Sequence, residues 1–306
     1  INMTTPMLDI TGKVTIDART QNGWNGNTEY GRSDASLCIV LNGSGATPHA
    51  FRVPALASSN ARLVVHGMMF AGFTDAAIRL ENGSNHRISG NQFGAVPFTA
   101  NNASAVRVTG ASGGATIGGF DDPAVVNVIA GSSVAGVYLD NTAGGNTVAN
   151  AVIGFQPDGD TQGGNAIGVY IFNSPNNSLL YNYIGFSGSN GVTISGAASS
   201  NTTLQYNSIG TGWLGNMAGN QGAGVGVVFA ANNSTIGAPL LSSYGRNAIF
   251  YNGGPGVWIS PSGGAGNRVL ANSFFENQNV DIDLARPPIR RAIRAAVRTG
   301  CRTTRS

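Results

Sequence analysis

Short phrases recur along this chain at intervals that favour a stacked repeat architecture. The first has Asn three residues before a Gly and reads NQFG at 91–94, NYIG at 182–185 and NSIG at 207–210. AVIG at 151–154 keeps the Gly but has Ala151 in place of the Asn. The last positions of this phrase and of its variants are 94, 118, 154, 185, 210, 237 and 275, so the intervals run from 24 to 38 residues. A unit this small cannot bury its apolar side alone, so neighbouring units must stack.

A second phrase, Gly-Val-x-aliphatic, predicts short strands. It occurs at 136–139, 168–171, 191–194 and 256–259, and the segments at 77–80, 105–108 and 224–227 fill the same place in other units. Apolar residues alternate with others at period 2, and Gly, Asn and Ser separate the segments, as is typical of strands joined by turns. Intervals near 24 residues suit one coil of a parallel β-solenoid. The longer intervals suit the same coil with an inserted loop, such as 155–165 or 211–220.

Two other repeat architectures fit less well. A leucine-rich repeat has a similar period, but it needs Leu at fixed positions and a helical segment, whereas Leu is scarce here and Gly interrupts every candidate helix. A β-propeller needs about 40 residues per blade, which the shortest intervals do not allow. Charged residues make up only 10% of the chain, which disfavours solvated amphipathic helices. We therefore expect an all-β chain, a single-stranded parallel β-helix of about nine coils. Stacked coils also explain the Asn, because side-chain amides can bond from coil to coil.

The repeats resemble those of the right-handed parallel β-helix proteins of the pectin-lyase-like superfamily, in their secreted or surface-attached bacterial form. The phrases that carry the resemblance are TIGGFDDPAVVNVIAG (116–131), NTVANAVIG (146–154) and NSLLYNYIG (177–185). The segments at 10–26 and 39–46 resemble the opening of such domains. The resemblance implies a right-handed coil. It implies no single activity, because the superfamily includes both polysaccharide lyases and modules without one.

The domain organisation follows from the repeats. We expect an N-terminal cap with the first strands in 1–50, β-helix repeats in 51–284, and a tail at 285–306. The tail carries seven Arg and no acid, whereas the chain before it carries ten positive and fourteen negative charges, a net charge of −4. The tail is interpreted as disordered or non-native, with a helix at 289–298 that caps the solenoid as the alternative. The two cysteines, Cys38 in the body and Cys301 in the tail, indicate no disulfide framework.

Charge and hydropathy exclude two classes of partner. A nucleic-acid-binding surface needs a basic patch on the folded body, and the net negative body offers none. No run of about 18 apolar residues is present, so we expect no membrane insertion. The first residue is Ile1, and we expect the chain to be part of a larger multidomain protein.

The Gly-Val-x-aliphatic phrase predicts which side chains face outward. Its Val and aliphatic residues lie two apart and should point inward together, so the residue between them and the one after the phrase point outward. Stacking seven coils gives two outward columns, which we call the strip. The first column is Arg79, Arg107, Tyr138, Tyr170, Thr193, Gly226 and Trp258, and the second is Glu81, Thr109, Asp140, Phe172, Ser195, Val228 and Ser260.

The strip suggests contact with a polysaccharide. Sugar rings stack on exposed aromatic rings, and Arg bonds hydroxyls or carboxylates. The expected ligand-binding residues are Arg79, Arg107, Tyr138, Tyr170, Phe172 and Trp258. The alternative is ordinary strand composition, since Tyr, Trp and Thr favour strands on any face.

Three residues of the strip are the nearest catalytic candidates. Glu81 and Asp140 lie two coils apart with Arg107 between them, which is the closest analogue here of the acidic ligands and basic residue that the resemblance to polysaccharide lyases implies. We expect no cofactor, except that a lyase of this kind could use Ca²⁺. We expect no metal site, and the closest candidates, Asp158 and Asp160, match a calcium loop incompletely because Gln162 stands at its third acidic place.

Three functions therefore remain open from the sequence. The first is a non-catalytic secreted or cell-surface module, such as an adhesin, that contacts polysaccharide or a cell-surface glycan through the strip. The second is a polysaccharide lyase or glycoside hydrolase acting on acidic glycans. The third is a purely structural repeat segment of a larger surface protein.

Overall fold

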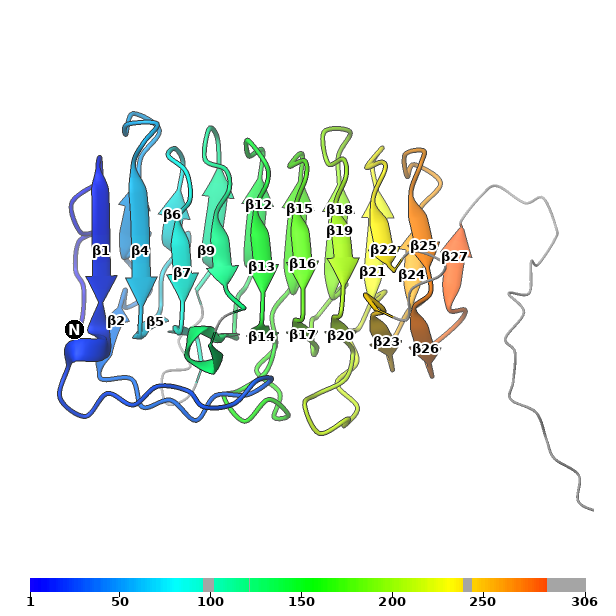
Figure 1. The fold of residues 1–306 in the computed structure, drawn as a ribbon, viewed down its shortest axis with the longest axis horizontal. Coiled ribbons are helices and arrows are strands. Elements are labelled where there is room, and N and C mark those ends of the chain that lie inside the picture. The colour runs from blue at the N-terminus through cyan, green and yellow to red at the C-terminus, as the bar shows by residue number, and fades with distance from the viewer. Residues whose placement is uncertain (96–101, 121, 239–243, 285–306) are drawn as a thin grey trace, which may run out of the picture.

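The repeats coil into a right-handed parallel β-helix of nine coils, as a computed structural model shows (Figure 1). The structure describes residues 1–95, 102–120, 122–238 and 244–284. Each coil contributes one strand to each of three sheets, and the strands of each sheet pair in parallel with their neighbours in the adjacent coils. The predicted fold class and the predicted number of coils are confirmed.

The three sheets differ in strand length, and the longest strands lie in sheet 3. Sheet 1 comprises β1 (Lys13–Asp17), β4 (Arg62–His66), β7 (Arg87–Ser89), β10 (Thr116–Gly118), β13 (Thr147–Ala149), β16 (Ser178–Leu180), β19 (Thr203–Gln205), β22 (Thr235–Gly237) and β25 (Arg268–Leu270). Sheet 2 comprises β2 (Ile39–Asn42), β5 (Met68–Ala71), β8 (Gln92–Phe93), β11 (Asn127–Ile129), β14 (Ala151–Ile153), β17 (Tyr183–Ile184), β20 (Ser208–Ile209), β23 (Ala248–Phe250) and β26 (Ser273–Phe275). Sheet 3 comprises β3 (Phe51–Val53), β6 (Ala76–Leu80), β9 (Ser104–Thr109), β12 (Ala135–Asp140), β15 (Val169–Phe172), β18 (Val192–Ser195), β21 (Val225–Val228), β24 (Val257–Ile259) and β27 (Ile282–Leu284). Two short 3₁₀ turns, η1 (Ala18–Thr20) and η2 (Pro123–Val125), lie between strands.

The core is a set of apolar columns that run along the helix axis. In sheet 3, the Val and the aliphatic residue of each Gly-Val-x-aliphatic phrase point inward; Val137 and Leu139 of β12, for example, are fully buried. Sheets 1 and 2 add columns such as Leu179 over Leu204 and Ile184 over Ile209, also fully buried. Because each side chain packs on its equivalent in the next coil, an apolar residue at a fixed place in the repeat is enough to extend the core.

Asparagines stack in the turn between sheet 1 and sheet 2. Asn182, Asn207, Asn247 and Asn272 follow one another coil by coil, and each Nδ2 donates to the Oδ1 of the next at 2.9 Å. Each Nδ2 also donates to a sheet 1 carbonyl of the preceding coil, as Asn207 does to Leu179. The predicted amide ladder is therefore present. It is interrupted at Ala151, whose backbone N–H alone bonds the Asn182 Oδ1.

The glycine that ends the Asn-x-aliphatic-Gly phrase is required by a close approach of two coils. Gly154 and Gly210 have φ of +89° and +93°, in the region that L side chains rarely adopt. A Cβ at Gly154 would lie 1.8 Å from the Gly185 carbonyl oxygen, and one at Gly210 would lie 1.9 Å from the Phe250 carbonyl oxygen. Neither position accepts a side chain without moving the backbone of the next coil.

Residues 21–38, which we call the strap, leave the first coil and run along the outside of the solenoid beneath sheet 2 (Figure 1). The Asn27 Nδ2 donates to the Pro123 carbonyl at 3.0 Å, and the Ser33 N–H donates to the Pro157 carbonyl at 2.6 Å. The Arg32 guanidinium lies 4.9 Å from the centre of the Trp213 ring. The strap therefore reaches from coil 1 to the loops of coils 4, 5 and 7.

The two ends of the chain differ in what the structure describes. Strands β1 and β2 lie within residues 1–50 and form the first coil together with β3. The Arg-rich tail, the alternative helix at 289–298 and Cys301 lie outside the described residues. Within the described ranges, no helix has the length and apolar character needed to cross a membrane.

Candidate functional site

The register of sheet 3 stacks the first column of the strip in the predicted order. Arg79 pairs with Arg107, Arg107 with Tyr138, and Tyr138 with Tyr170. The column then continues through Thr193, Gly226 and Trp258. In the second column, Asp140 pairs with Phe172. Residues far apart in the sequence therefore lie side by side along one face.

The aromatic part of the strip is a stack of rings. Tyr138 and Tyr170 lie parallel, with ring centres 5.0 Å apart and an interplanar angle of 4°. The Phe172 ring lies 6.2 Å from Tyr170, tilted by 44°. The Arg107 guanidinium lies 5.1 Å from the centre of the Tyr138 ring, within range of a cation–π contact. These four side chains are half-buried and form an uninterrupted row of one guanidinium and three aromatic rings.

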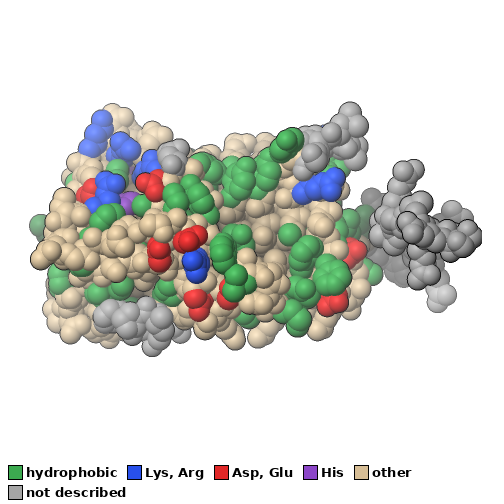
Figure 2. All heavy atoms as spheres, turned by 60° about the horizontal axis from the view of Figure 1, so that its bottom comes forward, with side chains coloured by type: hydrophobic (Ala, Val, Ile, Leu, Met, Phe, Trp, Pro, Cys, Tyr) green, Lys and Arg blue, Asp and Glu red, His purple; other side chains and the backbone are tan. Residues whose placement is uncertain are grey.

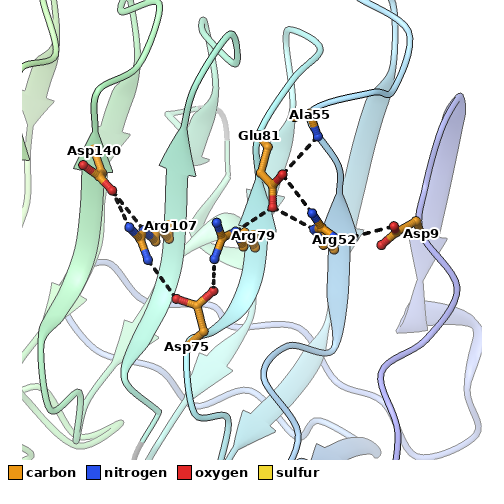
Figure 3. A network of polar contacts seen from close by, with 8 residues as sticks. All are labelled: Asp9, Arg52, Ala55, Asp75, Arg79, Glu81, Arg107 and Asp140. Atoms are coloured by element: carbon orange, nitrogen blue, oxygen red, sulfur yellow. Dashed lines mark hydrogen bonds and ion pairs between the residues drawn. The ribbon is translucent and has the colours of Figure 1, made fainter.

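The charged part of the strip is an alternating ion-pair network (Figure 3). Arg52 bonds Glu81 through Nε and Nη2 at 2.7 and 3.0 Å, and the Arg79 Nε lies 2.7 Å from the Glu81 Oε1. Arg79 and Arg107 both contact Asp75, the latter at 2.9 Å. The full order along the face is Asp9, Arg52, Glu81, Arg79, Asp75, Arg107 and Asp140. Four carboxylates and three guanidiniums leave a net charge of −1.

This network keeps the Glu81 carboxylate ionised. The Arg52 guanidinium lowers the pKa of Glu81; burial opposes it, and Arg79 and the Ala55 N–H add to the lowering. Burial lowers the pKa of Arg107, but its bonds to Asp140 and Asp75 outweigh burial, so that the pKa is raised overall. The Glu81 and Asp140 side chains are each only 9% exposed, so their bonds are poorly screened by solvent.

The lowered pKa of Glu81 predicts a loss of stability in acid. Protonation favours the unfolded chain, where the pKa is higher, so the contribution of Glu81 is complete above its unfolded pKa of about 4.3 and is lost as the pH falls through the folded pKa. We expect Glu81→Gln to lower the free energy of unfolding by about 2 kcal/mol at pH 7, since it removes bonds to charged donors. The difference in the free energy of unfolding between this variant and the unaltered chain should shrink as the pH falls from 5 towards 3. Urea unfolding at each pH measures it.

The matched control is Asp9→Asn at the exposed end of the same network. The Asp9 side chain is 42% exposed and lies 3.4 Å from Arg52, so its removal should cost less than that of Glu81 at every pH. A Glu81→Gln deficit that stays constant from pH 7 to pH 3 would contradict the assigned ionisation.

The predicted catalytic residues do not come together in one cluster, and the predicted metal ligands bond backbone N–H groups. Arg107 contacts Asp140 but not Glu81, which is bonded to Arg52 and Arg79 instead. The Asp158 Oδ1 accepts the N–H groups of Asp160 and Thr161 at 2.9 and 2.7 Å, and the Asp160 Oδ1 accepts the N–H of Leu214 at 3.2 Å. Both loop carboxylates therefore bond backbone. Among the described residues, no three His, Cys, Asp or Glu side chains are grouped so that they could hold a metal ion.

Three members of the network, Arg52, Asp75 and Asp9, do not belong to the predicted strip. Arg52 pairs with Arg79 in the sheet register, but its segment, FRV, carries no Gly-Val phrase. Asp75 lies in the turn before β6 and Asp9 lies before β1, both outside the repeated phrases. Arg52 could have been found from the sequence, because it stands one coil before Arg79 at the equivalent position. No signal in the spacing pointed to Asp75 or Asp9.

Comparison with known proteins found no matching family model and no matching curated protein. Two solved structures that are similar to this one are modules of mannuronan C-5 epimerases from Azotobacter vinelandii. The AlgE4 A-module is 12% identical over 92% of this chain and 88% of its own, with a TM-score of 0.47. The AlgE6 A-module is 11% identical over 92% of this chain and 90% of its own, with a TM-score of 0.39.

Proposed function

We propose that this β-helix is a non-catalytic secreted or cell-surface module that contacts polysaccharide through the strip on sheet 3. The observation that carries the proposal is the uninterrupted, half-exposed row of Arg107, Tyr138, Tyr170 and Phe172. Coils repeat every 4.8 Å or so, and a row that runs along the axis is matched by an extended polymer rather than by a small molecule. The partner is a polysaccharide or a cell-surface glycan, and the chain acts as part of a larger protein.

Ring stacking, rather than net charge, supports this contact. The arginines are already bonded to carboxylates, and the network has a net charge of −1, so the strip does not attract polyanions by its net charge. The faces and edges of Tyr138, Tyr170 and Phe172 offer apolar surface, to which the C–H faces of sugar rings are complementary. The Arg107 guanidinium lies beside the rings and its side chain is 27% exposed, so it can donate hydrogen bonds to sugar hydroxyls.

The state of Glu81 supports a binding role over catalysis. A glycosidase needs one protonated carboxylic acid near neutral pH, which requires a raised pKa. Glu81 has the opposite shift, and two guanidiniums hold it ionised. Arg107 is held by Asp75 and Asp140 on either side, which opposes its use as a mobile base.

The test is polysaccharide binding together with an assay for turnover. We expect the unaltered chain to bind at least one immobilised polymer from a set of uronate and neutral polysaccharides, without release of unsaturated or reducing ends, with or without Ca²⁺. The double variant Tyr138→Ala and Tyr170→Ala should weaken binding at least about fivefold, since each ring contributes about 0.5–1.5 kcal/mol.

Two controls separate stacking from other effects. Tyr138→Phe with Tyr170→Phe keeps both rings and should retain binding, and Tyr244→Ala removes a tyrosine that is 75% exposed away from the strip. Unchanged polysaccharide binding by the Tyr138→Ala, Tyr170→Ala variant would refute the proposal. Product release that depends on Glu81, Arg107 or Asp140 would replace it with the enzyme alternative.

A further inference from the structure

A pocket of about 430 Å³ lies on another edge of the solenoid, where sheet 1 meets sheet 2. Its volume falls in the usual range for small-ligand pockets, about 300–1,000 Å³. The strap forms one side of it, and the turns of coils 4 to 7 form the other. The side chains that define it are Tyr30, Phe120, Asn150, Tyr181, Tyr206 and Ser208.

Aromatic rings dominate this pocket, and they are open to solvent. Tyr181 and Tyr206 stack with ring centres 4.3 Å apart and an interplanar angle of 4°, and Phe120 meets Tyr181 edge-on at 5.9 Å. Tyr181 and Phe120 are each 44% exposed, and Tyr30, on the strap, is 45% exposed. Figure 2 shows the molecule with the side that carries sheet 2 turned towards the viewer, where hydrophobic side chains gather in separate patches between groups of charged ones. Grouped exposed aromatic residues of this kind mark binding surfaces.

The two stacked tyrosines occupy positions where the backbone does not favour them. Tyr181 and Tyr206 both have φ of +58°, in the left-handed region, and the equivalent residue one coil earlier is Asn150 at +47°. Asn tolerates this conformation, whereas a bulky aromatic residue is strained in it. Aromatic rings at two successive positions of this column are therefore not explained by the needs of the turn.

The lining chemistry selects a neutral ligand with hydroxyl groups. None of the described residues that line the pocket is charged. Tyr183 forms part of the wall, and burial, with Asp160 nearby, raises its pKa, so its phenol stays protonated. The Asn150 Nδ2 donates to the Gly119 carbonyl at 2.6 Å, which fixes the orientation of its amide. Phenol, hydroxyl and amide groups around ring faces match a sugar ring, which has a C–H face and a rim of hydroxyls.

We propose that this pocket is a second saccharide site, which binds a neutral pyranose ring between the strap and the Tyr181–Tyr206 stack. The inference does not rest on the strip, because the two sites share no residue. Together with the proposed function of the strip, it means that the chain holds a polysaccharide or glycan at two separate places on its surface.

The experiment titrates the protein with neutral β-1,4-linked glucose and mannose tetrasaccharides, using calorimetry and saturation-transfer NMR. The test variant is Tyr181→Asn with Tyr206→Asn, because Asn suits the left-handed backbone and the fold should be kept. We expect at least one tetrasaccharide to bind the unaltered chain, and the double variant to bind it at least about fivefold more weakly.

The matched control is Tyr251→Asn, since Tyr251 has the same φ of +58° but lies outside the pocket. It should bind the tetrasaccharide as the unaltered chain does, and so should the Tyr138→Ala, Tyr170→Ala variant of the strip. No binding of either tetrasaccharide at millimolar concentration overturns the inference, as does full binding by the Tyr181, Tyr206 variant. Loss in the strip variant alone would show that the sugar binds only on sheet 3, which also overturns it while leaving the proposed function intact.

Discussion

Replacing Gly210 by alanine is expected to destabilise the fold by about 4 kcal/mol. Two costs combine: a non-glycine residue at φ of +93° is strained by about 1–3 kcal/mol, and overpacking a filled site adds a similar amount. The added Cβ would lie 1.9 Å from the Phe250 carbonyl oxygen, which is backbone and cannot rotate away. Urea-induced unfolding followed by circular dichroism measures the loss.

The control for this variant is Gly215→Ala. Gly215 also has a positive φ, of +81°, but an added Cβ there meets no atom within 4 Å. It should cost about 1–2 kcal/mol from backbone strain alone. The additional loss of stability in Gly210→Ala then measures the contact between coils. Equal losses of stability in the two variants would contradict a close approach of Gly210 to the Phe250 carbonyl.

Replacing Asn207 by leucine should be about as damaging, for a different reason. Asn207 is 1% exposed, and its Nδ2 donates to the carbonyls of Leu179 and Gln205 as well as to Asn247. Its Oδ1 accepts both the backbone N–H and the Nδ2 of Asn182. Leucine keeps the volume roughly but leaves these buried groups unpaired at about 1–3 kcal/mol each, so we expect a loss of about 4 kcal/mol or more.

Hydrogen exchange gives the more specific readout for Asn207→Leu. Stability in a solenoid is a sum of local coil and interface contributions, so faster exchange should be concentrated in coils 6 to 8. Asn201→Gly is the control: it removes an exposed amide bond to Asn176 of 3.0 Å at a residue with φ of +57°, which glycine adopts freely. Its cost should stay below about 1 kcal/mol. Uniform acceleration along the whole chain would argue against local coupling.

The coil register could be predicted because the phrases mark equivalent positions. The Gly-Val-x-aliphatic phrases at 136–139 and 168–171, with 77–80 and 105–108 in the same place, align residue by residue, whatever the length of the loop between them. This alignment places Tyr138 over Tyr170 and Arg79 over Arg107 without any coordinates. Period 2 within the strands then separates inward from outward side chains.

What lies outside the repeat could not be predicted. Asp75 belongs to a turn, and only its side-chain direction brings it between Arg79 and Arg107. The aromatic pocket depends on the strap, whose path across the coils follows from single contacts such as Asn27 to Pro123 and not from any spacing. Tyr181 was visible in the sequence, but nothing there showed that Tyr30 would lie nearby.

The strap also orders the events of folding. Arg32 is made early, whereas its partner Trp213 lies about 180 residues later, in coil 7. Neighbouring coils can pair as soon as both have been synthesised, so the solenoid can grow from its first coil in the direction of translation. The strap can make its contacts with Pro123 and Pro157 once coils 4 and 5 are formed, but its contact with Trp213 closes a long loop and needs the seventh coil, so its attachment is completed in a late, long-range step. Until then, the part of the surface around Trp213 that the strap covers is not yet formed on the nascent chain.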